Sequence, residues 1–159
     1  LNSRVVMMCG VSGSGKTYYS RHLENHGFTR ISLDEIIWNR YGTLNKDISI
    51  NERKMIFDEA FRTLVGMLES NLKEGDKTVV DSTMCKRCKR HELRDICIKY
   101  GIDPLIVYLD VQRPLLEKRL SERSGSGPND LIVSREELVR FCSGFEIPVS
   151  DENFVKITM

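Results

Sequence analysis

The amino-acid sequence predicts an α/β fold in which a parallel sheet carries helices on both faces. Short runs of strand-forming residues alternate along the chain with longer stretches of helical periodicity, and this alternation is typical of parallel sheets. Residues 105–109 are apolar without interruption, as expected for a strand that is buried on both faces. With 159 residues the chain has the length of one domain, and we expect a single domain over residues 1–159.

Five strands are predicted from short runs rich in apolar and β-branched residues. The first run is closed by a glycine-rich stretch, and the third ends at Asp81. The strands are expected at residues 4–9, 28–33, 78–80, 105–109 and 154–158.

Helices are predicted between these strands from apolar periodicity and from signals at their ends. Ser49 precedes Glu52 by three residues, and Ser134 precedes Glu137 by three, which is the pattern of a capping box. Glycines follow three of the predicted helices, and Pro114 suits a first helical turn. The helices are expected over residues 16–26, 50–74 and 86–100, from Pro114 onward, and from Ser134 onward.

The longest predicted helix, residues 50–74, carries apolar residues at three- and four-residue spacing. Such a stripe lies on one face of a helix and packs against the core. The stripe consists of Phe57, Ala60, Phe61, Leu64, Leu68 and Leu72.

Composition and charge exclude several classes of protein. Hydrophobic residues make up 40% of the chain and charged residues 30%, and the formal net charge is +1. This charge offers no basic excess for nucleic acid, and no stretch approaches the roughly 18 apolar residues of a membrane span. The five cysteines are an odd number without a secretion signal, so we expect reduced thiols and a cytoplasmic protein.

Cys85 and Cys88 have the spacing of metal ligands, with His91 nearby. A structural zinc site needs four ligands, and no clear fourth ligand lies close in the sequence. We interpret the pair as ordinary thiols at the boundary between a loop and a helix.

The stretch GVSGSGKT, residues 10–17, matches the pattern G-x-x-x-x-G-K-[ST] in full. It follows a predicted strand and opens a predicted helix, which is the context that a phosphate-binding loop requires. A glycine loop can wrap a polyphosphate with its backbone amides, while Lys16 reaches the β- and γ-phosphates and Thr17 binds Mg²⁺. The predicted nucleotide-binding residues of this segment are Gly10, Ser12, Gly13, Ser14, Gly15, Lys16, Thr17 and Tyr18.

Three aspartates follow predicted strands, at the edge of the sheet where ligands bind in open α/β folds. Asp34 and Asp81 are the stronger candidates, and Asp110 is interpreted as an ordinary turn residue. One of the two could orient Mg²⁺, while the other could accept a proton from an attacking hydroxyl.

Arginines flank a glycine- and serine-rich segment, residues 124–129, and we expect a flexible lid over about residues 113–140. Arg119 and Arg123 are four residues apart, so they would share a helix face and point to one place. Arginines on a lid can stabilise the charge of a transferring phosphoryl group. Glu117 and Glu122 could instead pair with some of these arginines and leave a solvated basic face.

Taken in order, the motifs resemble a known family of small P-loop kinases. The resemblance covers nearly the whole chain and includes bacteriophage polynucleotide kinase (its 5′-kinase half), chloramphenicol phosphotransferase and the zeta toxins. The matching stretches are GVSGSGKT, SLDE at residues 32–35, VVDST at 79–83, LDVQRPLLEKRLSER at 109–123 and FEIPVSDE at 145–152.

The resemblance implies the P-loop NTPase fold with a five-stranded parallel sheet of order 2-3-1-4-5, and it implies ATP and Mg²⁺ as ligands. In this family Asp34 would be the base toward the acceptor hydroxyl, and Asp81 would assist the magnesium ion or the acceptor. Arg119 would pack on adenine or touch phosphate, Arg123 would contact the transferring phosphate, and Pro148 would lie near adenine.

Two positions depart from the pattern of the nucleic-acid kinases. Ile37 stands where an arginine follows the base by three residues, and Met84 stands where asparagine is frequent. Both weaken a polynucleotide 5′-hydroxyl as acceptor, although Arg40 could replace the missing arginine. The acceptor pocket is expected within residues 35–54, from Trp38, Arg40, Tyr41, Asn45, Lys46 and Arg53.

These observations favour an ATP-dependent kinase that phosphorylates a hydroxyl of a small molecule. The alternatives are a nucleotide-hydrolysing regulatory protein, a toxin-like kinase of a nucleotide sugar, and a polynucleotide 5′-hydroxyl kinase. The sequence leaves open the acceptor, the choice between ATP and GTP, the oligomeric state, and whether Asp34 or Asp81 is the base.

Overall fold

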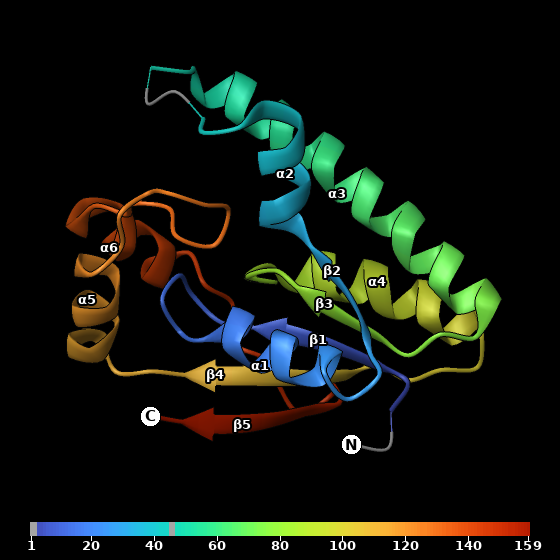
Figure 1. Ribbon diagram of the computed structural model, residues 1–159. Helices are drawn as coiled ribbons and strands as arrows, with labels where there is room; N and C mark the ends of the chain where they lie inside the picture. The colour runs from blue at the N-terminus through green and yellow to red at the C-terminus, as the bar shows by residue number, and fades with distance from the viewer. Residues whose placement is uncertain (1–2, 45–46) are drawn as a thin grey trace.

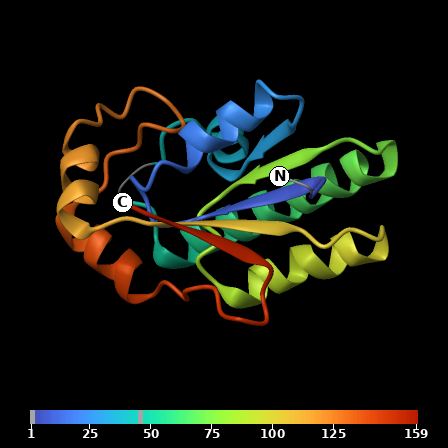
Figure 2. The ribbon, with the colours of Figure 1, turned by 90° about the horizontal axis from the view of Figure 1, so that it is seen from below.

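The computed structural model describes residues 3–44 and 47–159 and contains one five-stranded sheet (Figure 1). All neighbouring strands pair in parallel, in the order β2-β3-β1-β4-β5, which confirms the predicted fold class and strand order. Figure 2 shows β3, β1, β4 and β5 side by side. The strands are β1 Val5–Cys9, β2 Thr29–Ser32, β3 Thr78–Asp81, β4 Leu105–Asp110 and β5 Phe154–Thr158.

Six helices connect the described strands and cover the sheet. Ser49 and Ser134 form the predicted capping boxes with Glu52 and Glu137 at two of the helix starts. Figure 1 places α5 and α6 beyond the carboxyl ends of β1 and β4. The helices are α1 Lys16–Glu24, α2 Leu33–Tyr41, α3 Ile50–Glu74, α4 Arg87–Lys99, α5 Arg113–Ser121 and α6 Arg135–Ser143.

Side chains of β1 alternate between two separate cores, because successive residues of a strand point to opposite faces. Val5 and Met7 join a core that includes Leu64 and Leu68 of α3 and residues of α4. On the other face, residues of β1 pack with Phe28 and with side chains of α1. A third, smaller cluster of buried leucines holds α5 and α6 together beside the glycine loop: Leu116, Leu120 and Leu138.

Helix α2 was not predicted as a separate element. The Ser32 hydroxyl accepts a hydrogen bond from the Glu35 amide, and this N-cap starts the helix directly after β2. As a result Asp34 lies in the first turn of a helix and not in a loop. A short helix of nine residues gives only a weak periodic signal in sequence.

The apolar stripe of α3 is buried only in part, and the prediction for Phe57 is wrong. The stripe is buried from Ala60 onward, whereas Phe57 is 38% exposed. The amino-terminal part of α3 stands away from the sheet beside α2 (Figure 1).

Two features, a membrane-spanning helix and a cluster of metal ligands, are absent from residues 3–44 and 47–159. No helix in this part of the chain is long and apolar enough to cross a membrane. Nor does it contain a group of three or more His, Cys, Asp or Glu side chains that could hold a metal ion. The five cysteines are free thiols.

Candidate nucleotide and acceptor site

The glycine loop leads from the end of β1 into α1 and forms a turn that only small residues can adopt. Gly15 is the N-cap of α1 with φ +102°, a left-handed conformation that favours glycine. A Cβ atom at Gly10 would lie 2.5 Å from the Ser14 Oγ atom. The Gly10 amide donates to the Thr83 carbonyl oxygen over 3.1 Å, which fixes the start of the loop against the end of β3.

The amino terminus of α1 is suited to bind an anion. No side chain caps it, and no acidic residue lies in its first turn. Backbone amides and the helix dipole therefore present positive charge at the glycine loop. The Ser14 Oγ atom is buried and has no hydrogen-bond partner among the described residues. These observations fit the triphosphate of a nucleotide.

The Lys16 ammonium group folds back over the loop, where its Nζ atom donates to the Val11 carbonyl oxygen over 2.9 Å. Loss of hydration lowers the pKa of Lys16, and the negative charges of Asp81 and Asp34 oppose this shift. Lys16 is thus placed between the loop and the two aspartates that the sequence singled out, and its charge complements phosphate.

Asp81 ends β3 and is almost fully buried. Its Oδ2 atom accepts from the Ser20 hydroxyl over 2.9 Å and from Arg30 Nη2 over 2.6 Å. Every hydrogen bond to Asp81 among the described residues reaches Oδ2, which leaves Oδ1 without a protein donor there. Thr17, in the first turn of α1, and the Oδ1 atom of Asp81 are the groups that could hold Mg²⁺.

Arg30 was missed by the sequence analysis. It belongs to β2, its side chain is only 4% exposed, and it also binds Glu35 of α2 over 2.7 Å. Burial tends to raise the pKa of Glu35, but the hydrogen bond from Arg30 outweighs burial and holds that pKa below its ordinary value. A basic residue inside a short strand requires a buried partner, and this requirement was the available signal.

Glu35 in turn connects α2 to the lid, residues 113–140. The Asn129 Nδ2 atom donates to Glu35 Oε1 over 3.2 Å. Asp81, Arg30, Glu35 and Asn129 therefore form one chain of contacts from the end of β3 to the lid. Glu35 was expected only at the start of the acceptor pocket, and Asn129 was not singled out.

Asp34 is exposed as a residue, yet protein atoms crowd around its carboxyl group. Loss of hydration raises the pKa of Asp34 above its ordinary value, against the opposing charges of Lys16, Arg123 and Arg30. The charges of Lys16, Asp34, Asp81 and Arg123, which the sequence singled out, therefore act on one another. A carboxylate with a raised pKa in this position suits a general base.

Arg119 and Arg123 do not share a helix face, and this prediction is wrong. Helix α5 ends at Ser121, so Arg123 lies outside it and donates from Nη1 to the Leu131 carbonyl oxygen over 3.2 Å. Arg119 donates from Nη1 to the carbonyl oxygens of Gly13 and Ser14, each over 3.2 Å. Arg119 therefore supports the glycine loop, while the positive charge of Arg123 opposes the rise in the pKa of Asp34.

The segment of residues 124–129 was expected to be a flexible part of the lid, but the structure shows a turn that hydrogen bonds to Asp130 hold together. The Asp130 carboxylate accepts hydrogen bonds from the amides and hydroxyls of Ser124 and Ser126. The hydrogen bonds from Ser124 and Ser126 lower the pKa of Asp130 to about 2. The glycines and serines of this segment predicted flexibility, whereas the carboxylate of Asp130, which follows them, holds the turn.

Several basic residues of the lid region are paired on the surface. Arg113 lies 3.1 Å and Arg135 3.8 Å from Glu117, as the alternative interpretation anticipated. Asp110 lies 2.9 Å from Lys156 on the neighbouring strand, in agreement with an ordinary role for this aspartate.

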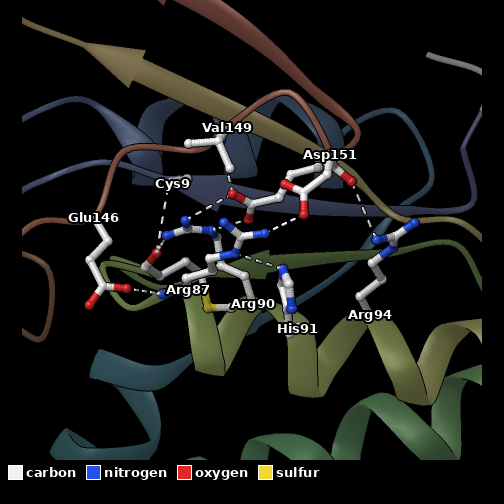
Figure 3. Close-up of polar contacts among 10 residues, drawn as sticks. Cys9, Arg87, Arg90, His91, Arg94, Glu146, Val149 and Asp151 are labelled. Carbon is white, nitrogen blue, oxygen red and sulfur yellow. Dashed lines mark hydrogen bonds and ion pairs between the residues drawn. The ribbon is translucent and has the colours of Figure 1, made fainter.

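The predicted adenine side of the site is a loop fastened to α4. Pro148 is buried within this loop, residues 145–152. Figure 3 shows the polar contacts that hold the loop, including ion pairs from Arg90 to Glu152 and from Arg87 to Asp151. Tyr18, in contrast, is 76% exposed on α1.

The predicted acceptor pocket is only partly available. Ile37 is buried, and Arg40 pairs with Glu59 of α3 over 2.7 Å. The Tyr41 hydroxyl donates to the same Glu59 side chain over 2.9 Å. Arg40 is thus paired with α3 in this structure. Trp38 and Arg53 are half-buried, while Asn45 and Lys46 lie outside the described residues.

Comparisons with solved structures agree with this architecture. A sugar kinase from Janibacter sp. HTCC2649 superposes with a TM-score of 0.71 at 20% identity, covering 98% of this chain and 85% of that chain. A gluconokinase from Sinorhizobium meliloti 1021 gives 0.63 at 19% identity, covering 97% and 81%. The APS kinase of Mycobacterium tuberculosis gives 0.63 at 17% identity, covering 98% and 88%. At these identities the similarity establishes the fold alone.

Among curated proteins no match to this sequence was found. A family model described as AAA domain matches residues 5–148, which is most of the chain and spans the glycine loop, both aspartates and the lid. Together with the strand order and the glycine loop, this match shows that the chain belongs to that AAA domain family and has the P-loop NTPase fold.

Proposed function

We propose that this protein is an ATP-dependent kinase that transfers the γ-phosphoryl group to a hydroxyl group of a small molecule. The observation that carries the proposal is the uncapped start of α1 at the glycine loop, with Lys16 bound to the Val11 carbonyl oxygen and with the charges of Asp34, Asp81 and Arg123 acting on Lys16. This set offers a cation for phosphate, two carboxylates with different surroundings and a second cation on the lid.

The nucleotide side would be formed by the glycine loop, Lys16 and Thr17. Loop amides and the start of α1 would bind the phosphates, and Pro148 would lie near the base. Thr17 and Asp81 would hold Mg²⁺, which neutralises phosphate charge when bound. Arg119 would act mainly by holding the loop, because its guanidinium already binds the Gly13 and Ser14 carbonyl oxygens.

Asp34 would accept the proton of the acceptor hydroxyl. The hydroxyl oxygen forms a bond to the γ-phosphorus, and the bond from that phosphorus to the β,γ-bridging oxygen breaks, releasing ADP. Arg123, whose charge interacts with that of Asp34, would stabilise the charge that develops on the transferring group. Asp81 is less suited to be the base, because Ser20 and Arg30 already donate to its carboxylate.

A small acceptor is favoured over a polynucleotide end. Ile37 is buried and Arg40 is paired with Glu59, so neither supplies the cation that a nucleic-acid backbone requires. The net charge of +1 points the same way. The sugar kinase, gluconokinase and APS kinase that share this fold are named for small acceptors, which supports the same class here.

The test is a screen of metabolite fractions with γ-labelled ATP and Mg²⁺. We expect a new phosphorylated small molecule with the natural protein, and none with Asp34→Asn. Asp110→Asn is the matched control, because this strand-end aspartate already pairs with Lys156 of β5. Release of labelled inorganic phosphate without any labelled acceptor would replace the kinase by a nucleotide hydrolase, and transfer to 5′-hydroxyl ends of oligonucleotides would replace the small acceptor.

A further inference from the structure

A fully buried ion pair lies outside the groups assigned so far. Arg90 of α4 and Glu152, just before β5, each expose only 1% of their side chains. The Arg90 Nε atom lies 2.6 Å from Glu152 Oε1, and Nη2 lies 3.1 Å from Oε2 (Figure 3). Such a pair pays a large desolvation cost and is weak evidence for a role in stability alone.

The third donor of Arg90 binds a strained backbone. Its Nη1 atom donates to the Met84 carbonyl oxygen over 2.7 Å. Met84 has φ +48°, and it is the only non-glycine residue with positive φ in the described part of the chain. A bulky residue adopts this conformation only where its surroundings hold it there. The hydrogen bond from Arg90 is the shorter of the two that side chains donate to this carbonyl oxygen among the described residues.

This turn lies directly against the glycine loop. The carbonyl oxygen of Thr83 accepts the hydrogen bond from the Gly10 amide, and the Cys9 thiol donates to the Met84 carbonyl oxygen over 3.6 Å. The position of the first loop glycine therefore depends on the turn at Thr83 and Met84.

The same ion pair also fixes the loop of residues 145–152. Glu152 Oε2 accepts from the Val149 amide over 3.0 Å, and the Glu146 amide donates to the Cys85 carbonyl oxygen over 2.9 Å. The phosphate end of the site and its predicted base side thus meet at a single buried pair.

We propose that Arg90 is a positioning residue for the nucleotide. Through Met84 it sets the turn that docks the glycine loop, and through Glu152 it sets the loop that carries Pro148. Only arginine offers donors for both tasks at once, which explains why a charge is kept in this core. The proposal rests on the proposed function, because it requires ATP at the glycine loop.

The test separates nucleotide binding from stability. The double variant Arg90→Met with Glu152→Leu removes both charges together, and apolar replacements of buried ion pairs commonly fold. We expect its affinity for MgATP to fall about tenfold or more, measured by titration calorimetry well below its Tm, because a hydrogen bond from a charged donor is lost. The matched control removes an exposed pair between α3 and α4, Arg62→Gln with Glu92→Gln, and should bind MgATP within twofold of the natural protein.

A second measurement covers the case in which the double variant does not fold. Arg90→Lys keeps a charge beside Glu152 but loses the fork that reaches Met84, so MgATP affinity should fall. Adding Met84→Asn should restore part of that affinity, because asparagine tolerates positive φ. Unchanged affinity in Arg90→Lys or in the folded double variant would overturn the proposal. If the natural protein itself does not bind MgATP, the proposed function fails and this inference fails with it.

Discussion

The two halves of the candidate site are built from different parts of the polypeptide. On the proposed phosphate side, a continuous segment of eight residues, Gly10 to Thr17, supplies the backbone amides and the lysine. The proposed acceptor side gathers around Asp34 of α2 from separate elements: Arg30 of β2, Glu35 of α2 and Asn129 of the lid, with Arg30 also paired to Asp81 of β3. The phosphate side can therefore be recognised in the sequence as a motif, whereas the acceptor side forms only when four elements come together in the fold.

The difference also concerns the kind of contact. Backbone hydrogen bonds help to fix the glycine loop, and its shape requires glycine where φ is positive, at Gly13 and Gly15. Side chains fix the acceptor half, so single substitutions there can alter the arrangement without unfolding the chain. We expect variants of the two halves to separate in nucleotide affinity and transfer rate.

The largest effect is expected at the centre of the acceptor half. Asp34→Asn should lower kcat by about 10²- to 10⁴-fold, because a positioned base is lost, while MgATP affinity stays the same. Rates of transfer and nucleotide titrations measure the two quantities. If transfer survives in Asp34→Asn and is lost in Asp81→Asn, the base has been assigned to the wrong aspartate.

The same residue gives a pH dependence. The pKa of Asp34 is raised, and the base acts only when ionised. Transfer should therefore decline as the pH falls through a value above the ordinary 3.8 of a free aspartate side chain. A profile of kcat/KM without an acidic limb above that value would argue against Asp34 as base.

On the phosphate side, Lys16→Ala should lower transfer by about 10²- to 10³-fold, since one preorganised cation at the phosphates is removed. Here, unlike in Asp34→Asn, MgATP affinity should fall as well. Lys156→Ala is the matched control, because this lysine pairs with Asp110 at the far side of β4. Undiminished turnover in Lys16→Ala would remove the phosphate-binding assignment.

Arg123→Ala should lower the transfer rate less than Lys16→Ala does. Loss of one charged hydrogen-bond donor corresponds to about a tenfold to hundredfold slower transfer. Because the charge of Arg123 interacts with that of Asp34, the proposed base, the transfer rate should fall more than ground-state MgATP binding. Arg113→Ala, which removes an exposed partner of Glu117, should leave both unchanged. Equal losses in rate and affinity would make Arg123 a binding residue only.

The smallest effect concerns the lid turn. Because the pKa of Asp130 is lowered to about 2, the turn keeps its hydrogen bonds above the ordinary value of 3.8 and loses them as the pH falls through about 2. The amide resonances of Ser124 and Ser126 should shift with that midpoint. A midpoint near 3.8 would show that the carboxylate does not hold the turn, and Asp130→Asn should abolish the transition.

Much of the fold could be predicted from the sequence, because its signals are local. The strand order followed from the resemblance, and the capping boxes at Ser49 and Ser134 followed from three-residue spacings. Helix α2 was missed, since nine residues that start directly after a strand leave little periodic pattern. Phe57 was misplaced, because the period of a helix does not tell where the sheet ends.

By itself the sequence determined the phosphate half of this protein, since glycines, lysine and threonine at fixed spacing admit one backbone shape. Only the tertiary structure decided that Arg30 holds Asp81 and Glu35, that Asp130 stiffens the lid turn, and that Arg90 reaches Met84. Each of these contacts pairs a charge with a group from another element or with a bent backbone. The free energy of burying that charge depends on surroundings that exist only in the folded chain.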